Sequence, residues 1–262
     1  MSKLLDRLER ISRGDSPPMG FGPVSTARKT EPSMVLLAFV DSPVRRVKSG
    51  SGDMTMDGIA ISESIAKGKD LNKVASSVNA PFWGIWWANQ PWDLLHSMKE
   101  AGCDFIIFPL GEIPVEILRD EDLGRILVVE SDIGDRALES IAGLPVDLVL
   151  LSGQEEDIPY TLNKLAELAY VREVAGRPVF LLRKKSLSVG ELEVLRESGV
   201  DGIIVQGAKD LIGEMRNNID ILPKRRSKGE RSFPTIPQVS RPSDVVERHE
   251  GDDEEYEDED PY

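Results

Sequence analysis

The sequence predicts an α/β fold made of a single closed (β/α)8 barrel. The clearest evidence is the segment from Gly199 to Met215 (GVDGIIVQGAKDLIGEM), in which a β-branched apolar run is followed by a glycine and a helical pattern. The same unit can be followed back along the chain in weaker form, so that eight apolar runs alternate with helical patterns. This alternation predicts a parallel sheet with right-handed crossovers, and eight parallel strands are the number that closes a barrel.

Each predicted strand is a short apolar run, as expected for a strand that is buried on both faces. The runs are residues 34–40, 57–62, 82–87, 104–108, 126–130, 147–151, 178–183 and 202–206. Helical patterns lie between most of them, at residues 70–78, 91–101, 114–120, 135–142, 161–175, 189–198 and 208–218. The barrel is therefore expected to occupy residues 34–222.

One connection departs from this pattern. Residues 41–56 (DSPVRRVKSGSGDMTM) show no apolar periodicity, so the first barrel helix is expected to be missing. Two interpretations of this basic, Gly- and Ser-rich loop are equally weighted. It either folds over a ligand at the strand-end face or is a solvated connector.

An additional helix is predicted before the barrel, because Leu4, Leu5, Leu8 and Ile11 share one stripe at helical spacing. Its apolar face is expected to close the bottom of the barrel. The alternative is that this face pairs with a second subunit in a homodimer. Residues 1–33 would then consist of this helix and a loop rich in Pro and Gly.

Residues 223–262 contain several prolines and few apolar residues, which predicts a disordered charged tail. Nine acidic residues between Glu250 and Asp260 account for most of the net charge of −14. We expect the tail to keep the protein soluble; the alternatives are that it binds a basic partner or folds back on the basic 41–56 loop. Because the rest of the chain is mildly acidic, no binding of nucleic acid is expected.

The chain contains no apolar run near the ~20 residues of a membrane span, and its first residues are charged, so we expect a cytoplasmic protein with no membrane association. Its single cysteine, Cys103, fits a reducing compartment and is expected to pack below a strand. His96 lies off the apolar stripe of its helix and His249 lies in the tail. Hydrolases with a Ser/His/Asp or Cys/His arrangement are therefore not expected.

The segment GVDGIIVQGA, preceded by an ESG helix end, resembles the last strand of aldolase-type, phosphate-binding TIM barrels such as thiamine phosphate synthase and indole-glycerol-phosphate synthase. Such families grip a phosphate between the loops after strands seven and eight. The resemblance implies a phosphate site at Gly207 and Ala208. Where such barrels often carry a glycine pair after strand seven, this chain has Arg183, Lys184 and Lys185, so cationic side chains would have to replace backbone amides.

Further candidates lie at the carboxyl ends of the strands, where TIM barrels carry their active sites. Glu130 ends an apolar run and is expected to be partly desolvated, which suits a carboxyl group to proton transfer. A salt bridge to Arg183 or Lys185 is expected ahead of this catalytic role. Lys185 is the second catalytic candidate, although anion binding is the simpler use of its charge. Additional ligand-binding candidates are Gln206, Ser152 and Trp87.

All four tryptophans lie in the run FWGIWWANQPW. The two-residue period of a strand places Trp83 and Trp87 on one face and Trp86 on the other. Trp86 or Trp87 could stack on a flat ligand such as a flavin or a nicotinamide, but packing in the core is the more frequent use of tryptophan. The sequence therefore identifies no cofactor.

A metal alternative rests on hard oxygen ligands that could converge on the same face and would suit magnesium. These are Asp41, Glu63, Glu130, Asp132 and Glu155. No close-spaced ligand motif supports this alternative, so no metal site is predicted.

Three functions are compatible with these patterns. The first is an enzyme, such as a lyase, isomerase or synthase, that acts on a small phosphorylated metabolite. The second is a degenerate barrel that serves as a scaffold or interaction module, and the third is a flavin- or nucleotide-binding barrel. The sequence does not decide whether the barrel is catalytically active.

Overall fold

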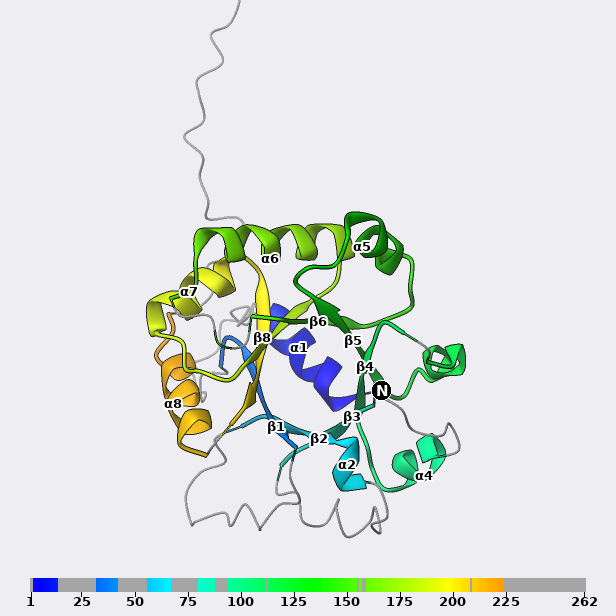
Figure 1. Ribbon diagram of the computed structural model, residues 1–262. Coiled ribbons are helices and arrows are strands. Elements are labelled where there is room, and N and C mark those ends of the chain that lie inside the picture. Colours follow the sequence, from blue (N-terminus) through cyan, green and yellow to red (C-terminus); the bar gives the residue numbers. More distant parts are fainter. Residues whose placement is uncertain are drawn as a thin grey trace, which may run out of the picture. The chain divides into compact units, whose positions relative to one another are not determined.

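Eight parallel strands form a closed ring in the computed structural model of the chain (Figure 1). The strand order follows the sequence, and β8 closes the ring by pairing with β1. The structure describes residues 2–13, 32–41, 56–66, 80–87, 94–111, 113–154, 156, 159–207 and 209–223. The predicted (β/α)8 barrel is confirmed.

The apolar runs located every strand to within two residues of its ends. The strands are β1 (Val35–Val40), β2 (Gly58–Ser62), β3 (Trp83–Trp86), β4 (Phe105–Pro109), β5 (Gly124–Glu130), β6 (Leu148–Ser152), β7 (Val179–Arg183) and β8 (Val200–Gln206).

The described helices surround this ring, apart from α1, which crosses its centre in the end view of Figure 1. They are α1 (Lys3–Arg13), α2 (Glu63–Ala66), α4 (Leu94–Glu100), α5 (Asp135–Ala142), α6 (Leu162–Ala175), α7 (Val189–Glu197) and α8 (Lys209–Asp220), with the 3-10 helix η1 (Val115–Arg119). None of the helices in the described ranges is long and apolar enough to cross a membrane.

Two helical predictions need correction. The segment predicted as an α-helix at residues 114–120 forms the 3-10 helix η1. The short helix α2 was not predicted, because four residues are too few to show a helical period. The predicted helix at residues 70–78 lies outside the described residues. So do residues 42–55, where the first barrel helix is expected to be missing, the 14–31 loop and the tail from residue 224 onward.

Alternating residues of each strand contribute to two different cores. One buried cluster fills the interior of the barrel: Val35, Leu37, Ala60, Phe82, Phe105, Ile107, Ile126, Val128, Leu148, Leu150, Phe180, Leu182 and Ile204. The intervening strand residues pack outward against the helices in a second cluster, which includes Met98, Leu168, Leu192 and Met215. Because both faces of the strands are buried, the strands read as continuous apolar runs in the sequence.

Phenylalanine rings in the interior occupy space that is left by glycines on neighbouring strands. A Cβ atom added to Gly84 would lie 2.3 Å from the ring of Phe105, which pairs with Gly84 in the ladder. A Cβ atom added to Gly202 would lie 2.5 Å from the ring of Phe180, its partner in the ladder. The rings therefore fill the barrel only because these positions carry no side chain.

Helix α1 closes the amino end of the barrel. Leu4, Leu8 and Ile11 are buried in the same cluster as the interior strand residues, which confirms the expected internal role of the apolar face. The carboxylate of Asp104, just before β4, accepts hydrogen bonds from Ser2 Oγ at 2.9 Å and from the N–H groups of Lys3 and Leu4 at 2.7 and 3.0 Å. A side chain from the barrel thus caps the first turn of the helix.

Three other aspartates at the amino end each bind the backbone of the preceding strand. Asp57 accepts from Leu36 N–H at 2.9 Å, Asp147 from Arg125 N–H at 2.8 Å and Asp201 from Val179 N–H at 3.3 Å. An arginine also contacts each carboxylate: Arg216 for Asp57, Arg125 for Asp147 and Arg172 for Asp201. These contacts satisfy N–H groups at the beginnings of strands β1, β5 and β7.

We predict that Asp104→Ala destabilises the protein by roughly 2–4 kcal/mol, because three hydrogen bonds to a carboxylate are lost at a largely buried position. Chemical denaturation would measure the change. Glu173→Gln, at an exposed position of α6, is the control and should change stability by less than about 0.5 kcal/mol. Equal stabilities of the two variants would contradict the capping role.

We also predict that truncation after Arg225 leaves the free energy of unfolding nearly unchanged. Residues Met1–Arg225 form one compact unit, within which Leu222 is buried and Pro223 O accepts a hydrogen bond from Arg196. Denaturation of the truncated and full-length proteins would test this. A large loss of stability would show that residues after 225 contribute to the packed core.

Candidate functional site

The carboxyl ends of β5, β6 and β8 carry three of the predicted site residues. Glu130 continues the inward-facing series of Ile126 and Val128, and it pairs in the ladder with Ser152 of β6. Gln206 continues the inward-facing series of β8 after Ile204. Because alternate residues share a face of the strand, Glu130, Ser152 and Gln206 all belong to the barrel mouth.

Glu130 differs in its environment from the expectation. Its side chain is exposed, so the expected partial desolvation is wrong. Within the part of the chain that the structure describes, Glu130 forms no ion pair, and the predicted salt bridge to Arg183 or Lys185 is absent there. Glu130 is thus an accessible carboxylate at the mouth.

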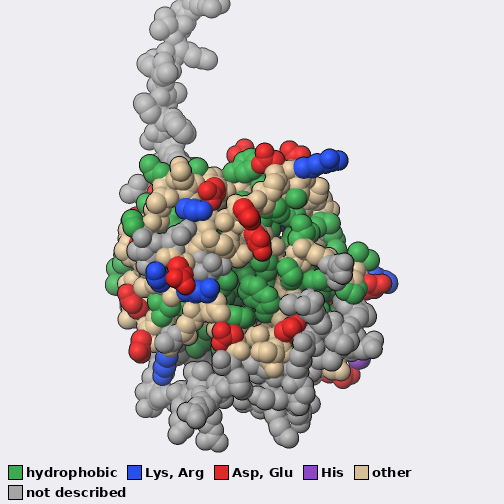
Figure 2. Space-filling model, viewed as in Figure 1, with side chains coloured by type: hydrophobic (Ala, Val, Ile, Leu, Met, Phe, Trp, Pro, Cys, Tyr) green, Lys and Arg blue, Asp and Glu red, His purple; other side chains and the backbone are tan. Residues whose placement is uncertain are grey.

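An aromatic pair lies on the inward side of the mouth. The ring centroids of Phe39 and Trp86 are 5.1 Å apart, with the planes inclined by 55°, and both residues pack against the interior cluster. Trp87 faces the other way: it is 1% exposed and belongs to the cluster between strands and helices. The selection of Trp87 as a ligand-binding residue is therefore corrected, because the strand alternation turns Trp86 to the mouth instead. In the end view of Figure 2, hydrophobic side chains gather near the centre and charged side chains lie around them.

Gln206 is oriented by a contact across the β8–β1 pair. Its Nε2 donates to Asp41 Oδ2 at 3.1 Å, and Asp41 directly follows β1. The amide of Gln206 therefore keeps its carbonyl oxygen and a second N–H for other partners.

Arg183 also differs from its predicted role. It is fully buried and belongs to the outward-facing series of β7, together with Val179 and Leu181. Its guanidinium donates to Gln154 O and lies 5.8 Å from the ring centre of Tyr160. Arg183 thus fixes the loop after β6, and the structure does not place it at the barrel mouth.

A polar network that sequence reasoning missed continues from this arginine. Gln154 is 2% exposed, accepts a hydrogen bond from Tyr160 OH at 2.5 Å and donates to Glu167 at 3.0 Å. Glu191 on α7 accepts from the N–H of Tyr160 at 2.9 Å and forms a capping box with Ser188. The spacing of Ser188 and Glu191 could have indicated the capping box. The position of Gln154 after the sixth apolar run places it at a strand end, but nothing in the sequence indicates its burial or its partners.

The network changes the titration of Glu191. Partial burial by itself would raise the pKa of this carboxyl group. The hydrogen bonds from Tyr160 and Ser188, together with the positive charge of Arg183, outweigh burial and lower the pKa. The ionised carboxylate therefore holds the loops after β6 and β7 together.

The candidates of the implied phosphate site lie after β7 and β8. Lys184 and Lys185 are exposed, and Lys185 Nζ lies 3.9 Å from Glu156 Oε2 in a pair that is open to solvent. Gly207 is exposed as well, and a Cβ atom there would lie 2.8 Å from Leu211 Cδ2. Ala208 lies outside the described residues, and α8 begins at Lys209.

Cys103 and His96 are two further groups of the described residues that could react. Burial raises the pKa of the Cys103 thiol to about 12, which keeps it protonated and unreactive. His96 is exposed and lies 3.3 Å from Glu100, as expected of a surface residue. Among the residues whose placement is described, no group of three His, Cys, Asp or Glu side chains is arranged to hold a metal; Glu155 of the metal alternative is outside them.

We predict that Glu191→Gln lowers stability more at pH 7 than in acid. Because the folded-state pKa is lowered, the stabilisation by Glu191 is fully present above the unfolded-state pKa of about 4.3 and is lost as the pH falls through the folded-state value. The difference in stability between the two proteins, measured by denaturation at pH 7 and at about pH 3, should therefore be smaller at the lower pH. Glu197→Gln, an exposed position on the same helix, is the control. A deficit for Glu191→Gln of the same size at both pH values would contradict the role of the charge.

Comparisons with known proteins identify the fold. The sequence matches no protein-family model and no curated protein sequence. Among solved structures, tryptophan synthase from M. tuberculosis is similar, with 14% identity and a TM-score of 0.51 over 72% of this chain and 93% of that chain. A protein from Aquifex aeolicus VF5 has 10% identity and a TM-score of 0.55 over 83% of this chain and 99% of that one. At these identities the comparison confirms the resemblance to TIM barrels as a similarity of fold.

Proposed function

We propose that the chain binds a small phosphorylated molecule at the carboxyl end of the barrel and acts on it as a lyase, isomerase or synthase. The observation that carries the proposal is the adjacency of the loops after β7 and β8. Arg183 at the end of β7 pairs with Val205 of β8 in the ladder. The next residues, Lys184 and Gln206, therefore lie at neighbouring positions where the two strands end. Two lysines, an amide and the glycine turn before α8 thus border one small region.

The chemistry of these groups suits a phosphate. The lysines supply positive charge, while the turn at Gly207 brings the backbone to the N-terminus of α8 without side-chain bulk, a position that favours anions. The ion pair between Lys185 and Glu156 is solvent-exposed and therefore weak, so a phosphate can replace it. Asp210 in the first turn of α8 opposes an anion, which makes the lysines necessary to the proposal.

Glu130 and Lys185 are the proposed catalytic residues. Glu130 is accessible at the mouth and lies two strands from β7, with Ser152 beside it as a hydroxyl that can orient a substrate. A carboxylate in this position can take a proton from a substrate that is anchored by its phosphate. The shared fold with the M. tuberculosis tryptophan synthase structure is compatible with such a reaction but does not specify it.

A second candidate function is supported by the aromatic pair. The rings of Phe39 and Trp86 lie on the inward side of the mouth, where they could stack against a flat ligand such as a flavin or a nucleotide. A nucleotide would combine this stacking with the phosphate site. The scaffold function remains the alternative if no ligand binds.

We predict that at least one compound in a panel of phosphorylated metabolites and nucleotides raises the melting temperature of the protein. A ligand at 100 times its dissociation constant adds roughly 2.7 kcal/mol of stability. With that compound, Gly207→Val and Lys185→Ala should each weaken binding about tenfold or more, since the first places a side chain in the turn and the second removes a charge. Calorimetric titration would measure the affinities.

The matched controls are Gly143→Val and Arg136→Ala, which lie at the two ends of α5 and do not border the proposed site. Both should bind as tightly as the parent protein. If no phosphorylated compound shifts the parent, or if both site variants bind like the parent, the phosphate proposal fails and the scaffold function is favoured.

A further inference from the structure

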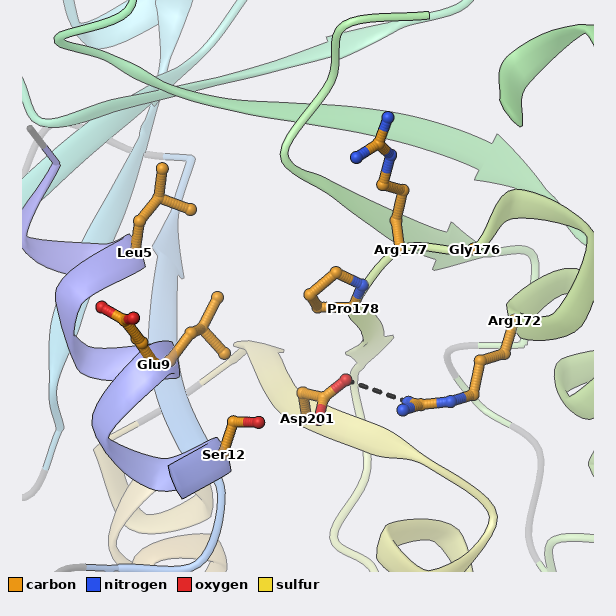
Figure 3. Close-up of a pocket in the computed structure, with 9 residues that line it drawn as sticks. Leu5, Glu9, Ser12, Arg172, Gly176, Arg177, Pro178 and Asp201 are labelled. Atoms are coloured by element: carbon orange, nitrogen blue, oxygen red, sulfur yellow. Dashed lines mark hydrogen bonds and ion pairs between the residues drawn. The ribbon is translucent and has the colours of Figure 1, made fainter. Parts of the chain in front are cut away.

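A cavity lies at the amino end of the barrel, opposite the mouth, between α1 and the beginnings of β7 and β8 (Figure 3). Its volume is about 530 Å³, which is within the range of small-molecule sites. Leu5 and Leu8 of α1 form one side, and Pro178 and Asp201 face them from the strands. This cavity exists because an additional helix covers the barrel.

The anchoring of α1 explains why the cavity lies where it does. The first turn of the helix is bound to Asp104 before β4, and Arg7 pairs with Asp57 before β2 at 3.3 Å. In a ring of eight strands in sequence order, β8 lies across the barrel from β4. The helix is therefore held down on one side, and the cavity opens on the other side, next to β7 and β8.

The lining of the cavity combines an apolar wall with two arginines, Arg172 and Arg177, and two carboxylates, Glu9 and Asp201. Leu5, Leu8 and Pro178 supply the apolar surface. Arg172 is already neutralised, because it pairs with Asp201 at 3.0 Å (Figure 3).

Arg177 is different. Within the described residues its guanidinium has no carboxylate partner, and it forms one long hydrogen bond, of 3.4 Å, to Leu144 O. Arg177 thus borders the cavity with most of its donors available.

We propose that this cavity is a binding site for a small amphipathic anion, with a carboxylate or phosphate head at Arg177 and an apolar body against Leu5, Leu8 and Pro178. An arginine beside an apolar surface suits such a ligand, because guanidinium is weakly hydrated and binds either head group in a bidentate manner. The site is separate from the barrel mouth and does not depend on the function proposed for it.

The test uses octanoate and octyl phosphate as probes, with 1-octanol as the neutral analogue and inorganic phosphate as the isolated head. Calorimetric titration of the full-length protein should show saturable binding of at least one of the two amphipathic anions. It should show much weaker binding of 1-octanol and inorganic phosphate. The tighter of the two anions identifies the preferred head group.

Two variants address the two halves of the site. Arg177→Gln removes the cation at the cost of one long hydrogen bond, and Ser12→Trp places a large side chain into the cavity from an exposed position of α1. Each should weaken probe binding about tenfold or more, whereas Arg136→Gln on α5 should leave it unchanged. Circular dichroism would confirm that the variants are folded.

Three results would overturn the proposal. These are the absence of saturable binding to the parent, equal affinities of the parent and both cavity variants, and a loss of binding in Lys185→Ala but not in Arg177→Gln. The last result would place the probe at the barrel mouth.

Discussion

The carboxylates at the amino ends of alternate strands are the interaction on which the rest of the barrel depends. Asp57, Asp147 and Asp201 each bind an N–H group at the beginning of the preceding strand, and Asp104 binds the first turn of α1 in the same layer. A largely buried carboxylate is tolerated only when hydrogen bonds or cations satisfy it. At Asp57, Asp147 and Asp201 an arginine supplies the cation. The same contact, an aspartate that accepts from backbone N–H groups, thus holds the strands of the ring together and attaches the covering helix to it.

This arrangement separates the two ends of the barrel. At the amino end, the charged groups are mostly committed to one another and to backbone, as in the pair of Arg125 and Asp147. At the carboxyl end, Glu130, Lys184 and Lys185 are exposed, and Lys185 forms only a solvent-exposed ion pair with Glu156, at 3.9 Å. The carboxyl end can therefore change its partners without disturbing the fold, which is the condition for a binding or catalytic surface.

The strands could be predicted from the sequence because burial on both faces produces uninterrupted apolar runs. The same property prevented a correct assignment of Trp87 and Arg183. A strand without polar alternation does not reveal which residues turn inward, so one residue of register decides between the mouth and the helix layer. Trp86, next in the chain, takes the place at the mouth that was expected for Trp87. The amino-end cavity was also beyond prediction, since it depends on where α1 is anchored, and the key contact joins Leu4 and Asp104, which are 100 positions apart in the chain.

The glycines that face phenylalanine rings inside the barrel have a consequence for how the sequence can vary. Gly202 and Phe180 share a single volume across two strands, so neither of them is free to change by itself. Gly84 is more restricted, because a Cβ atom there would lie 2.3 Å from the backbone oxygen of Phe105 as well as from its ring. A side chain can enter at Gly202 only if the opposite ring becomes smaller. A substitution at Gly202 is therefore expected to occur together with a smaller side chain at position 180, a coupled exchange between two neighbouring strands.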